Sequence, residues 1–192
     1  MSTFQRFKTL QKRSDIKSIY KVIEYIAFFY HIVSSVFKLT MSLITLSDEC
    51  LAAALKAKSG KVTYCFLKFV NNTTVEVESL SETSCRDGKS VSPREAWAEV
   101  EAKFPEDRCV LALVNVRYLS EVDAVERAKL ILVHWAPARA SMKEKMVASF
   151  SLNGIINQLG SSGIAHRHQA GNVADLDYAH VVEQALARST VK

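Results

Sequence analysis

The stretch from Arg127 to Leu159 decides the fold, and it reads RAKLILVHWAPARASMKEKMVASFSLNGIINQL. Its first part, Leu130 to Trp135, is a continuous apolar run that is too short to span a membrane and rich enough in branched residues for a buried central strand. Pro137 ends this strand because it has no N–H to donate to a neighbouring strand. Ser141 is then a suitable N-cap for a helix from about Met142 to Leu159. The sequence therefore predicts a buried strand, a tight turn and a long helix.

The predicted long helix has two distinct faces. A stripe of residues three or four apart faces the core, and it consists of Ala148, Leu152, Ile155 and Leu159. The opposite row mixes polar residues with two large apolar ones, and it consists of Lys143, Met146, Phe150, Asn153 and Asn157. Large apolar side chains in a row that faces solvent are typical of a surface that binds a partner protein.

The residues around this helix carry a family resemblance. WAPARASMKEKMVAS, residues 135–149, resembles the motif that opens the long helix of the actin-depolymerising factor/cofilin family. The resemblance extends almost without gaps over residues 41–188, and the other stretches that carry it, in the family's order, are LSDECLAA (46–53), KFPEDRCVLAL (103–113), ERAK (126–129) and GIAHRHQAGNVADLD (163–177). Several separated motifs in the right order are more specific than any one of them.

The composition suits one globular domain with a tail. The chain has 192 residues, of which 48% are hydrophobic and 23% charged. Residues 1–40 hold seven of the 25 basic residues and two of the 20 acidic ones, which leaves 18 of each for residues 41–192. Because this larger part is neutral overall, we expect no nucleic-acid partner.

Residues 1–40 differ in kind from the rest, because a basic start is followed by the apolar run from Val22 to Leu39. Three interpretations remain open: a membrane-associating basic helix, an organellar presequence, or upstream sequence joined to a domain that starts at Met41. We favour the third, since MSLITLSDEC resembles an ordinary start for the family. The predicted organisation is therefore an extension over 1–40 and an ADF-homology domain over 41–192.

Local signals along the domain predict its remaining elements. Helices are expected from Ser47 to Lys58 with Leu51, Ala54 and Leu55 inward, from Ser92-Pro93 onward with Trp97, Val100 and Phe104 inward, and over 177–188. Strands are expected over 62–70, 73–79, 109–116 and 164–169, with a hairpin turn at Asn71-Asn72 and a surface loop over 80–91. This order predicts an α/β fold of the α+β type, with a mixed sheet of about five strands between helices. The resemblance implies the same fold.

Nothing in the sequence indicates an enzyme or a cofactor. Motifs for a hydrolase nucleophile, a phosphate loop, a zinc protease or a dinucleotide loop are absent. The four cysteines form no CxxC or Cys/His cluster, so we expect buried thiols rather than a zinc site or a disulfide scaffold. His166 and His168 alternate on one strand face as half of a metal site would, but no other ligand accompanies them, and we expect them to face water. His134 is expected to be a hydrogen-bonded core histidine.

The resemblance implies a surface that grips monomeric actin. Carried over by motif, it comprises Ser42, Leu43 and Ser47 near the start of the domain, Lys143, Lys145 and Met146 on the long helix, and the turn from Asn172 to Asp175. The chemistry is suitable, because the lysines attract acidic actin and a methionine is a flexible apolar anchor for a cleft.

A second surface implied by the resemblance contacts filament sides. It comprises Arg127 and Lys129 at the base of a projecting hairpin, with Glu183 and Arg188 on the last helix. The chain departs from the family at Glu126, Gln184 and the Ile156-Asn157 pair, where basic residues are usual. Because each change removes positive charge from a surface that meets a negatively charged partner, we predict weaker filament binding than in a typical relative.

The resemblance thus implies a non-enzymatic, monomeric, cytoplasmic protein that binds actin monomers and filaments and promotes severing and depolymerisation. Ser42 aligns with a regulatory serine, whose phosphate would repel actin. Lys143 and Lys145 also make phosphoinositides candidate ligands, a prediction that the neutral charge of residues 41–192 weakens. Two alternatives stay open: a coactosin-like filament binder without depolymerising activity, and a membrane-localised adaptor that uses residues 1–40.

Overall fold

The structure is a computed structural model that describes residues 44–70, 73–85 and 91–187. The chain divides into two units, Met1–Ser42 and Leu43–Lys192, and all described residues belong to the second. The predictions for residues 1–40, Ser42, Leu43, the Asn71-Asn72 turn and Arg188 therefore lie outside the described residues.

The described chain is built on a mixed six-stranded sheet, which confirms the predicted fold class. The strands are β1 (Thr45–Leu46), β2 (Tyr64–Phe69), β3 (Thr74–Leu80), β4 (Val110–Leu119), β5 (Glu126–Trp135) and β6 (His166–Ala170), and their order is β1-β3-β2-β4-β5-β6. Adjacent strands among the four inner ones are antiparallel, whereas β1 and β6 run parallel to their neighbours at the two edges. The strand missed by the sequence pattern is β1, because two residues are too few to show a period.

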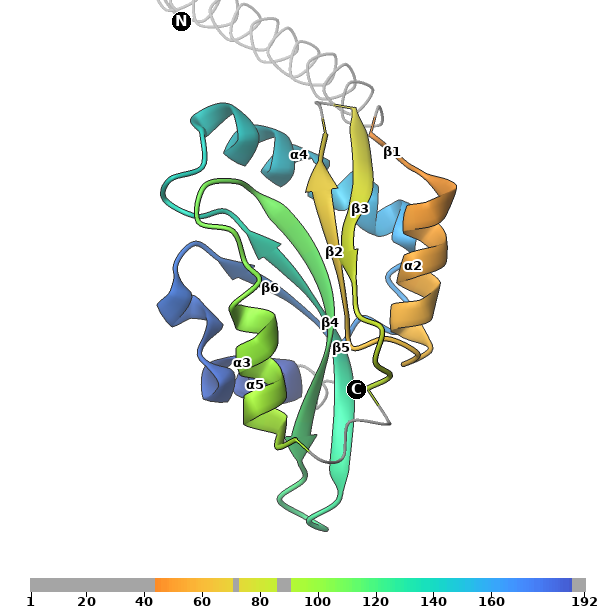
Figure 1. Cartoon of the computed structure of the whole chain (residues 1–192), viewed down its shortest axis with the longest axis vertical. Helices are drawn as coiled ribbons and strands as arrows, with labels where there is room; N and C mark the ends of the chain where they lie inside the picture. The colour runs from red at the N-terminus through yellow and green to blue at the C-terminus, as the bar shows by residue number, and fades with distance from the viewer. Residues whose placement is uncertain (1–43, 71–72, 86–90, 188–192) are drawn as a thin grey trace, which may run out of the picture. The chain divides into compact units, whose positions relative to one another are not determined.

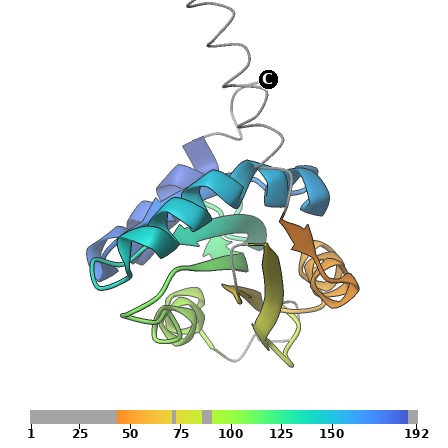
Figure 2. The ribbon, with the colours of Figure 1, turned by 90° about the horizontal axis from the view of Figure 1, so that it is seen from above.

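Helices cover both faces of this sheet (Figures 1 and 2). One face packs against α2 (Asp48–Lys58) and α4 (Met142–Leu159), and the other against α3 (Pro93–Glu101) and α5 (Tyr178–Ala187). A 3-10 turn, η1 (Val173–Leu176), precedes α5 and was not predicted. None of the described helices is long and apolar enough to cross a membrane.

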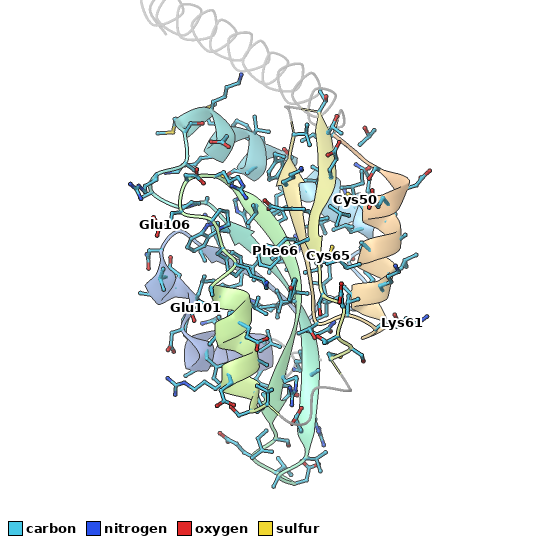
Figure 3. The ribbon with its side chains drawn as sticks, viewed as in Figure 1. Cys50, Lys61, Cys65, Phe66, Glu101 and Glu106 are labelled. Atoms are coloured by element: carbon cyan, nitrogen blue, oxygen red, sulfur yellow. The ribbon has the colours of Figure 1, made fainter. Side chains whose placement is uncertain are left out.

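The strand residues alternate between two separate cores. On β2, Cys65 enters the core under α2 and α4, while the next residue, Phe66, enters the core under α3 (Figure 3). On β4, Leu111 and Leu113 serve the first core, and Val110 and Ala112 serve the second. A strand covered on both faces must be apolar at successive positions, which explains the continuous apolar runs in the sequence.

The long helix α4 begins and ends as its sequence predicts. Ser141 Oγ accepts a hydrogen bond from the Glu144 N–H at 3.2 Å, and Glu144 Oε2 accepts one from the Ser141 N–H at 3.2 Å. This reciprocal capping box satisfies donors that the first helical turn leaves open. At the other end Gly160 has a φ of 73°, a conformation that favours glycine.

Two packing expectations were wrong. Leu55 is exposed, because α2 turns its small residues toward the sheet: Cys50, Ala53, Ala54 and Ala57 are the buried ones. Ile156 is only 1% exposed and lies beside Ile155 in the core shared with α2. Because Ile156 is buried, it removes no positive charge from the surface. The predicted loss of positive charge at the Ile156-Asn157 pair therefore applies only to Asn157, which is exposed.

Candidate functional site

Four residues on the outer side of α4 form an exposed surface, here called the α4 patch: Met142, Lys143, Met146 and Phe150. Met146 is 51% exposed and Met142 is 74% exposed, although apolar side chains of this size are usually buried. Lys143 is exposed, whereas Lys145 is half-buried and its Nζ donates to the Ala138 carbonyl at 3.0 Å. The predicted methionine thus faces outward, with Lys143 projecting beside it and Lys145 held against the preceding turn.

The turn from Asn172 to Asp175 is held by hydrogen bonds of its own and follows β6. Asp175 Oδ2 accepts hydrogen bonds from the N–H groups of Gly171 at 2.8 Å and Asn172 at 3.1 Å, and these bonds lower the pKa of Asp175. Asn172 Oδ1 in turn accepts from the Asp175 N–H at 3.1 Å. The Ala136 N–H donates to the Ala170 carbonyl at 2.9 Å, which joins the connection before α4 to the strand before this turn.

Ser47, the one predicted N-terminal contact among the described residues, lies at the start of α2. Ser47 is the N-cap of α2, and its Oγ accepts from the Cys50 N–H at 3.2 Å. The preceding residues, Ile44 to Leu46, bond to Gln158 near the end of α4. Since a helix rises 1.5 Å per residue, about 18 Å separates this contact from Met146. The structure therefore places Ile44 and Leu46 near the end of α4, whereas the α4 patch lies near its start.

The predicted filament residues lie on the β4–β5 hairpin and α5, and the hairpin projects at the bottom of Figure 1. Arg127 is exposed and forms an ion pair with Asp123 at 2.5 Å. Lys129 is half-buried, its Nζ donates to the Ala185 carbonyl of α5 at 3.2 Å, and burial lowers its pKa. Glu183 is exposed on α5. The Lys129 bond holds the hairpin and α5 together, and the Asp123–Arg127 ion pair was not predicted.

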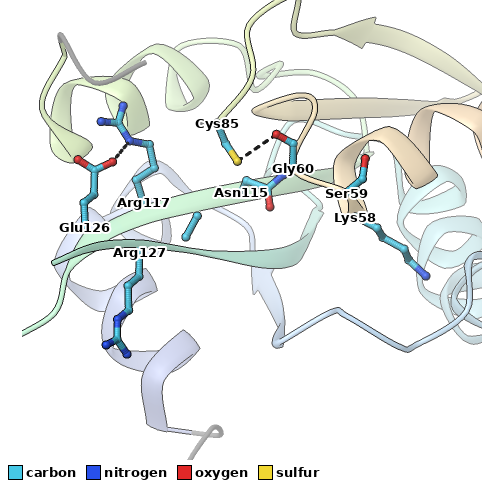
Figure 4. Close-up of a pocket in the computed structure, with 9 residues that line it drawn as sticks. Lys58, Ser59, Gly60, Cys85, Asn115, Arg117, Glu126 and Arg127 are labelled. Atoms are coloured by element: carbon cyan, nitrogen blue, oxygen red, sulfur yellow. Dashed lines mark hydrogen bonds and ion pairs between the residues drawn. The ribbon is translucent and has the colours of Figure 1, made fainter. Parts of the chain in front are cut away.

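The base of this hairpin contains a buried arginine that the sequence did not single out. The Arg117 side chain is 4% exposed, and its Nε donates to Glu126 Oε1 at 2.5 Å. Arg117 Nη2 also donates to the Val91 carbonyl at 3.0 Å, and the Tyr178 hydroxyl donates to the Arg117 carbonyl at 2.9 Å. Arg117 lines a pocket of about 530 Å³ with Asn115 and Glu126, but Arg117 and Arg127 point in different directions in it (Figure 4).

The histidines differ from expectation. His166 and His168 do share one strand face, but both are buried against the α3 and α5 side rather than facing water. The His168 ring lies 5.8 Å from His166 and 5.9 Å from His180, and its Nε2 donates to the Asp175 carbonyl at 2.7 Å. Among the described residues, no group of three or more His, Cys, Asp or Glu is arranged to hold a metal ion.

His134 is a core residue, as predicted, but it is not fully hydrogen-bonded. Its Nε2 is buried and has no hydrogen-bond partner in the described part of the chain. Burial lowers the pKa of His134, because a charged imidazole is poorly solvated in the core. All four cysteines are buried, as expected for thiols in apolar stretches, and none forms a disulfide within the described ranges.

Comparison with known proteins shows to which family the chain belongs. The profile described as "Cofilin/tropomyosin-type actin-binding protein" matches residues 43–186, about three quarters of the chain. The chain belongs to the actin-depolymerising factor/cofilin family. It is 28% identical to actophorin from Acanthamoeba castellanii over 147 residues, which cover 76% of this chain and 96% of actophorin. It is 25% identical to cofilin from Saccharomyces cerevisiae over 141 residues, which cover 73% of this chain and 91% of that protein.

A solved cofilin has the same fold. The crystal structure of Streptomyces griseoflavus cofilin superposes with a TM-score of 0.58 at 29% sequence identity, covering 74% of this chain and 98% of that one. The family is one of actin-binding, non-enzymatic proteins, in agreement with the absence of catalytic motifs in the sequence. The mixed sheet between two layers of helices is thus the family's fold.

Proposed function

We propose that this cofilin-family chain binds actin monomers and filament sides in the cytoplasm and promotes filament severing and depolymerisation. The observation that carries the proposal is the exposed Met146 beside Lys143 on a capped, well-packed helix. A flexible thioether on a rigid support is suited to filling a cleft on another protein. The adjacent cation increases the rate of association with an acidic partner.

The position of the Asn172–Asp175 turn supports the same proposal. This turn follows β6, whose last residue is hydrogen-bonded to the connection before α4, and it exposes Val173, which is 64% accessible. The turn therefore offers a second exposed apolar side chain, next to the exposed polar residue Asn172. An apolar centre with polar groups around it is the usual composition of a protein-binding surface.

We further propose that filament binding is weaker than in a typical relative. Asp123 neutralises Arg127, and Lys129 is occupied by the Ala185 carbonyl. Glu126 supplies negative charge at the same hairpin, although it is itself paired with Arg117. The described part of this surface therefore offers little unpaired positive charge to a filament. Because positive charges at the rim of an interface speed association with a negatively charged partner, their loss slows association with filaments.

Two variants of the full chain test the monomer site. Met146→Ala and Lys143→Glu should each weaken binding to monomeric actin about tenfold, as truncation of an interface anchor or reversal of a steering charge does. Pyrene-actin disassembly should slow in parallel. The control is Lys61→Glu, which makes the same charge reversal at an exposed residue beyond the end of α2 (Figure 3). Unchanged actin dynamics in both α4 variants would refute the assignment.

The same assays separate the competing functions. Saturating filament binding without monomer binding would indicate a coactosin-like protein instead. Co-sedimentation with phosphoinositide vesicles by the full chain, but not by residues 41–192, would indicate a membrane adaptor that uses residues 1–40. Loss of vesicle binding in Lys143→Glu would instead assign the lipid to the α4 patch.

A further inference from the structure

The β4–β5 hairpin extends beyond its neighbouring strands as a two-stranded ribbon. The strand pairing of β2 with β4 ends at Val114, and that of β6 with β5 begins at Ile131. Beyond these points β4 and β5 continue to pair with each other as far as Leu119 and Glu126, and no other strand of the described chain flanks them. A pair of strands alone is marginally stable and twists more than a wider sheet. Other contacts must therefore fix the direction in which the ribbon leaves the sheet.

One such contact comes from Tyr178 at the start of α5. The Asn115 N–H donates to the Thr63 carbonyl at 2.8 Å, so the backbone groups of Asn115 point toward the β2 edge of β4. Because the backbone groups of a strand alternate between its two edges, those of Arg117 point to the same edge, at a level where β2 has ended. The Tyr178 hydroxyl donates to the Arg117 carbonyl at 2.9 Å. It therefore bonds to β4 where a neighbouring strand is missing.

A second contact comes from the other end of α5. Lys129 on β5 donates from Nζ to the Ala185 carbonyl at 3.2 Å. The last carbonyls of a helix lack partners within the helix and attract cations. Val181 and Ala185 are buried in the core under α3 and α5, so α5 is itself held in place. Contacts at the two ends of one packed helix thus support both strands of the ribbon.

We infer that Tyr178 is a positioning residue for the filament contact, a role that rests on the filament binding proposed above. Arg127 lies on the ribbon, so the angle of the ribbon decides where this guanidinium meets a filament. The α4 patch lies on another element, and the Tyr178 bond does not reach it. Tyr178 should therefore affect filament binding and leave monomer binding unchanged.

The burial of Tyr178 supports this role. Burial raises the pKa of the Tyr178 hydroxyl above its ordinary value, so the hydroxyl stays protonated and remains a donor at neutral pH. Its ring packs against the core under α3 and α5, which fixes the position of the hydroxyl. The bond to Arg117 is thus available throughout the pH range in which actin binding is measured.

The size of the effect follows from preorganisation. A ribbon held at one angle loses less conformational freedom on binding than one that pivots at its base. Removing the Tyr178 hydroxyl leaves the Lys129 bond and the ion pair between Arg117 and Glu126 in place. Losing one net hydrogen bond of preorganisation corresponds to about two- to fivefold in affinity.

Tyr178→Phe in the full chain is the direct test, because phenylalanine keeps the packed ring and removes only the hydroxyl. We expect the amides of Tyr118 and Arg127, which face each other across the ribbon, to exchange with solvent about two- to fivefold faster. Co-sedimentation with filaments at low salt should show a two- to fivefold loss of affinity, on the order set by that one hydrogen bond. The affinity for monomeric actin should not change.

Two controls separate positioning from loss of a hydroxyl and from loss of stability. Tyr64→Phe removes another half-buried tyrosine hydroxyl, on β2, and should leave both affinities at the wild-type level. Val100→Ala opens a cavity in the core under α3 and should lower the free energy of unfolding. Measured well below its unfolding temperature, this variant should keep the wild-type ratio of filament to monomer affinity.

The outcomes are distinct. Equal losses of filament and monomer affinity in Tyr178→Phe would show a general structural role and overturn the inference. Unchanged filament affinity, or unchanged exchange of the ribbon amides, would overturn it as well. A wild-type chain that fails to bind filaments would refute the proposed filament function itself, whereas the exchange measurement on the ribbon needs no actin.

Discussion

Arg117 and Glu126 form an ion pair across the base of the β4–β5 hairpin, with Arg117 Nε 2.5 Å from Glu126 Oε1 and the arginine side chain almost fully buried. The hydrogen bond to Glu126 raises the pKa of Arg117, so the guanidinium stays charged throughout the accessible pH range. Glu126, which departs from the family pattern, is thus the counter-ion of a buried cation. It is not a surface substitution without effect on the fold.

Replacing Glu126 with lysine should destabilise the fold even though it restores the charge usual in the family. The change removes the partner of a buried arginine and adds a like charge, and we expect a loss of about 2–4 kcal/mol in the free energy of unfolding, less than for a fully buried pair because Glu126 is partly exposed. Urea denaturation measures this loss. Glu121→Lys makes the same change at an exposed site on the hairpin, and equal stability of the two variants would contradict the prediction.

Asp123→Asn should strengthen filament binding. It removes the carboxylate that pairs with the exposed Arg127, leaving that guanidinium available to a negatively charged partner. Co-sedimentation with filaments should show an affinity gain of about two- to fivefold at low salt, which shrinks at high salt because exposed charges are screened. Asp107→Asn is the charge-matched control away from the hairpin. A gain that is independent of salt would show that the effect is not electrostatic.

Asp175 should make stability depend on pH in the acid range. Hydrogen bonds, first that from the Gly171 N–H, lower the pKa of Asp175 in the folded chain. Its contribution is therefore fully present above the unfolded pKa of about 3.9 and is lost as pH falls through the lower folded value. The stability difference between the wild type and Asp175→Asn should be larger at neutral pH than in acid. A stability difference between the two chains that grows as the pH falls would contradict the prediction.

Cys65 should be inert in the native chain. Burial, with a smaller effect of Cys50, raises the pKa of Cys65 to about 12, so roughly one thiol in ten thousand is ionised at pH 8. Iodoacetamide should label Cys65 only after unfolding in urea, as mass spectrometry of peptides from the treated full chain will report. Native labelling at a rate close to that in urea would contradict the burial of this thiol.

Removing residues 1–40 should increase actin affinity. The predicted contacts at Ser42 and Leu43 directly follow this extension in the sequence, and in the full chain they are not close to a chain end. If the extension opposes docking sterically, residues 41–192 will bind monomeric actin more tightly and disassemble filaments faster. Equal affinity of the two forms would refute the steric effect.

The sequence by itself determined the elements whose signals are local. The cap at Ser141, the apolar period of α4 and the apolar runs of β4 and β5 each depend on residues within a few positions of one another. The outward position of Met146 followed from the same helical period. For this reason the mixed α+β architecture and the candidate monomer surface were both predictable.

Only the tertiary structure decided which polar residues find partners. Arg117 with Glu126 and Gln158 with Ile44 join positions that the chain must fold to bring together, and the second pair is 114 residues apart. The burial of Ile156, His166 and His168 likewise depends on which helix packs on which face. A sequence period fixes the directions in which side chains point, but the elements that meet them are fixed by packing of the whole domain.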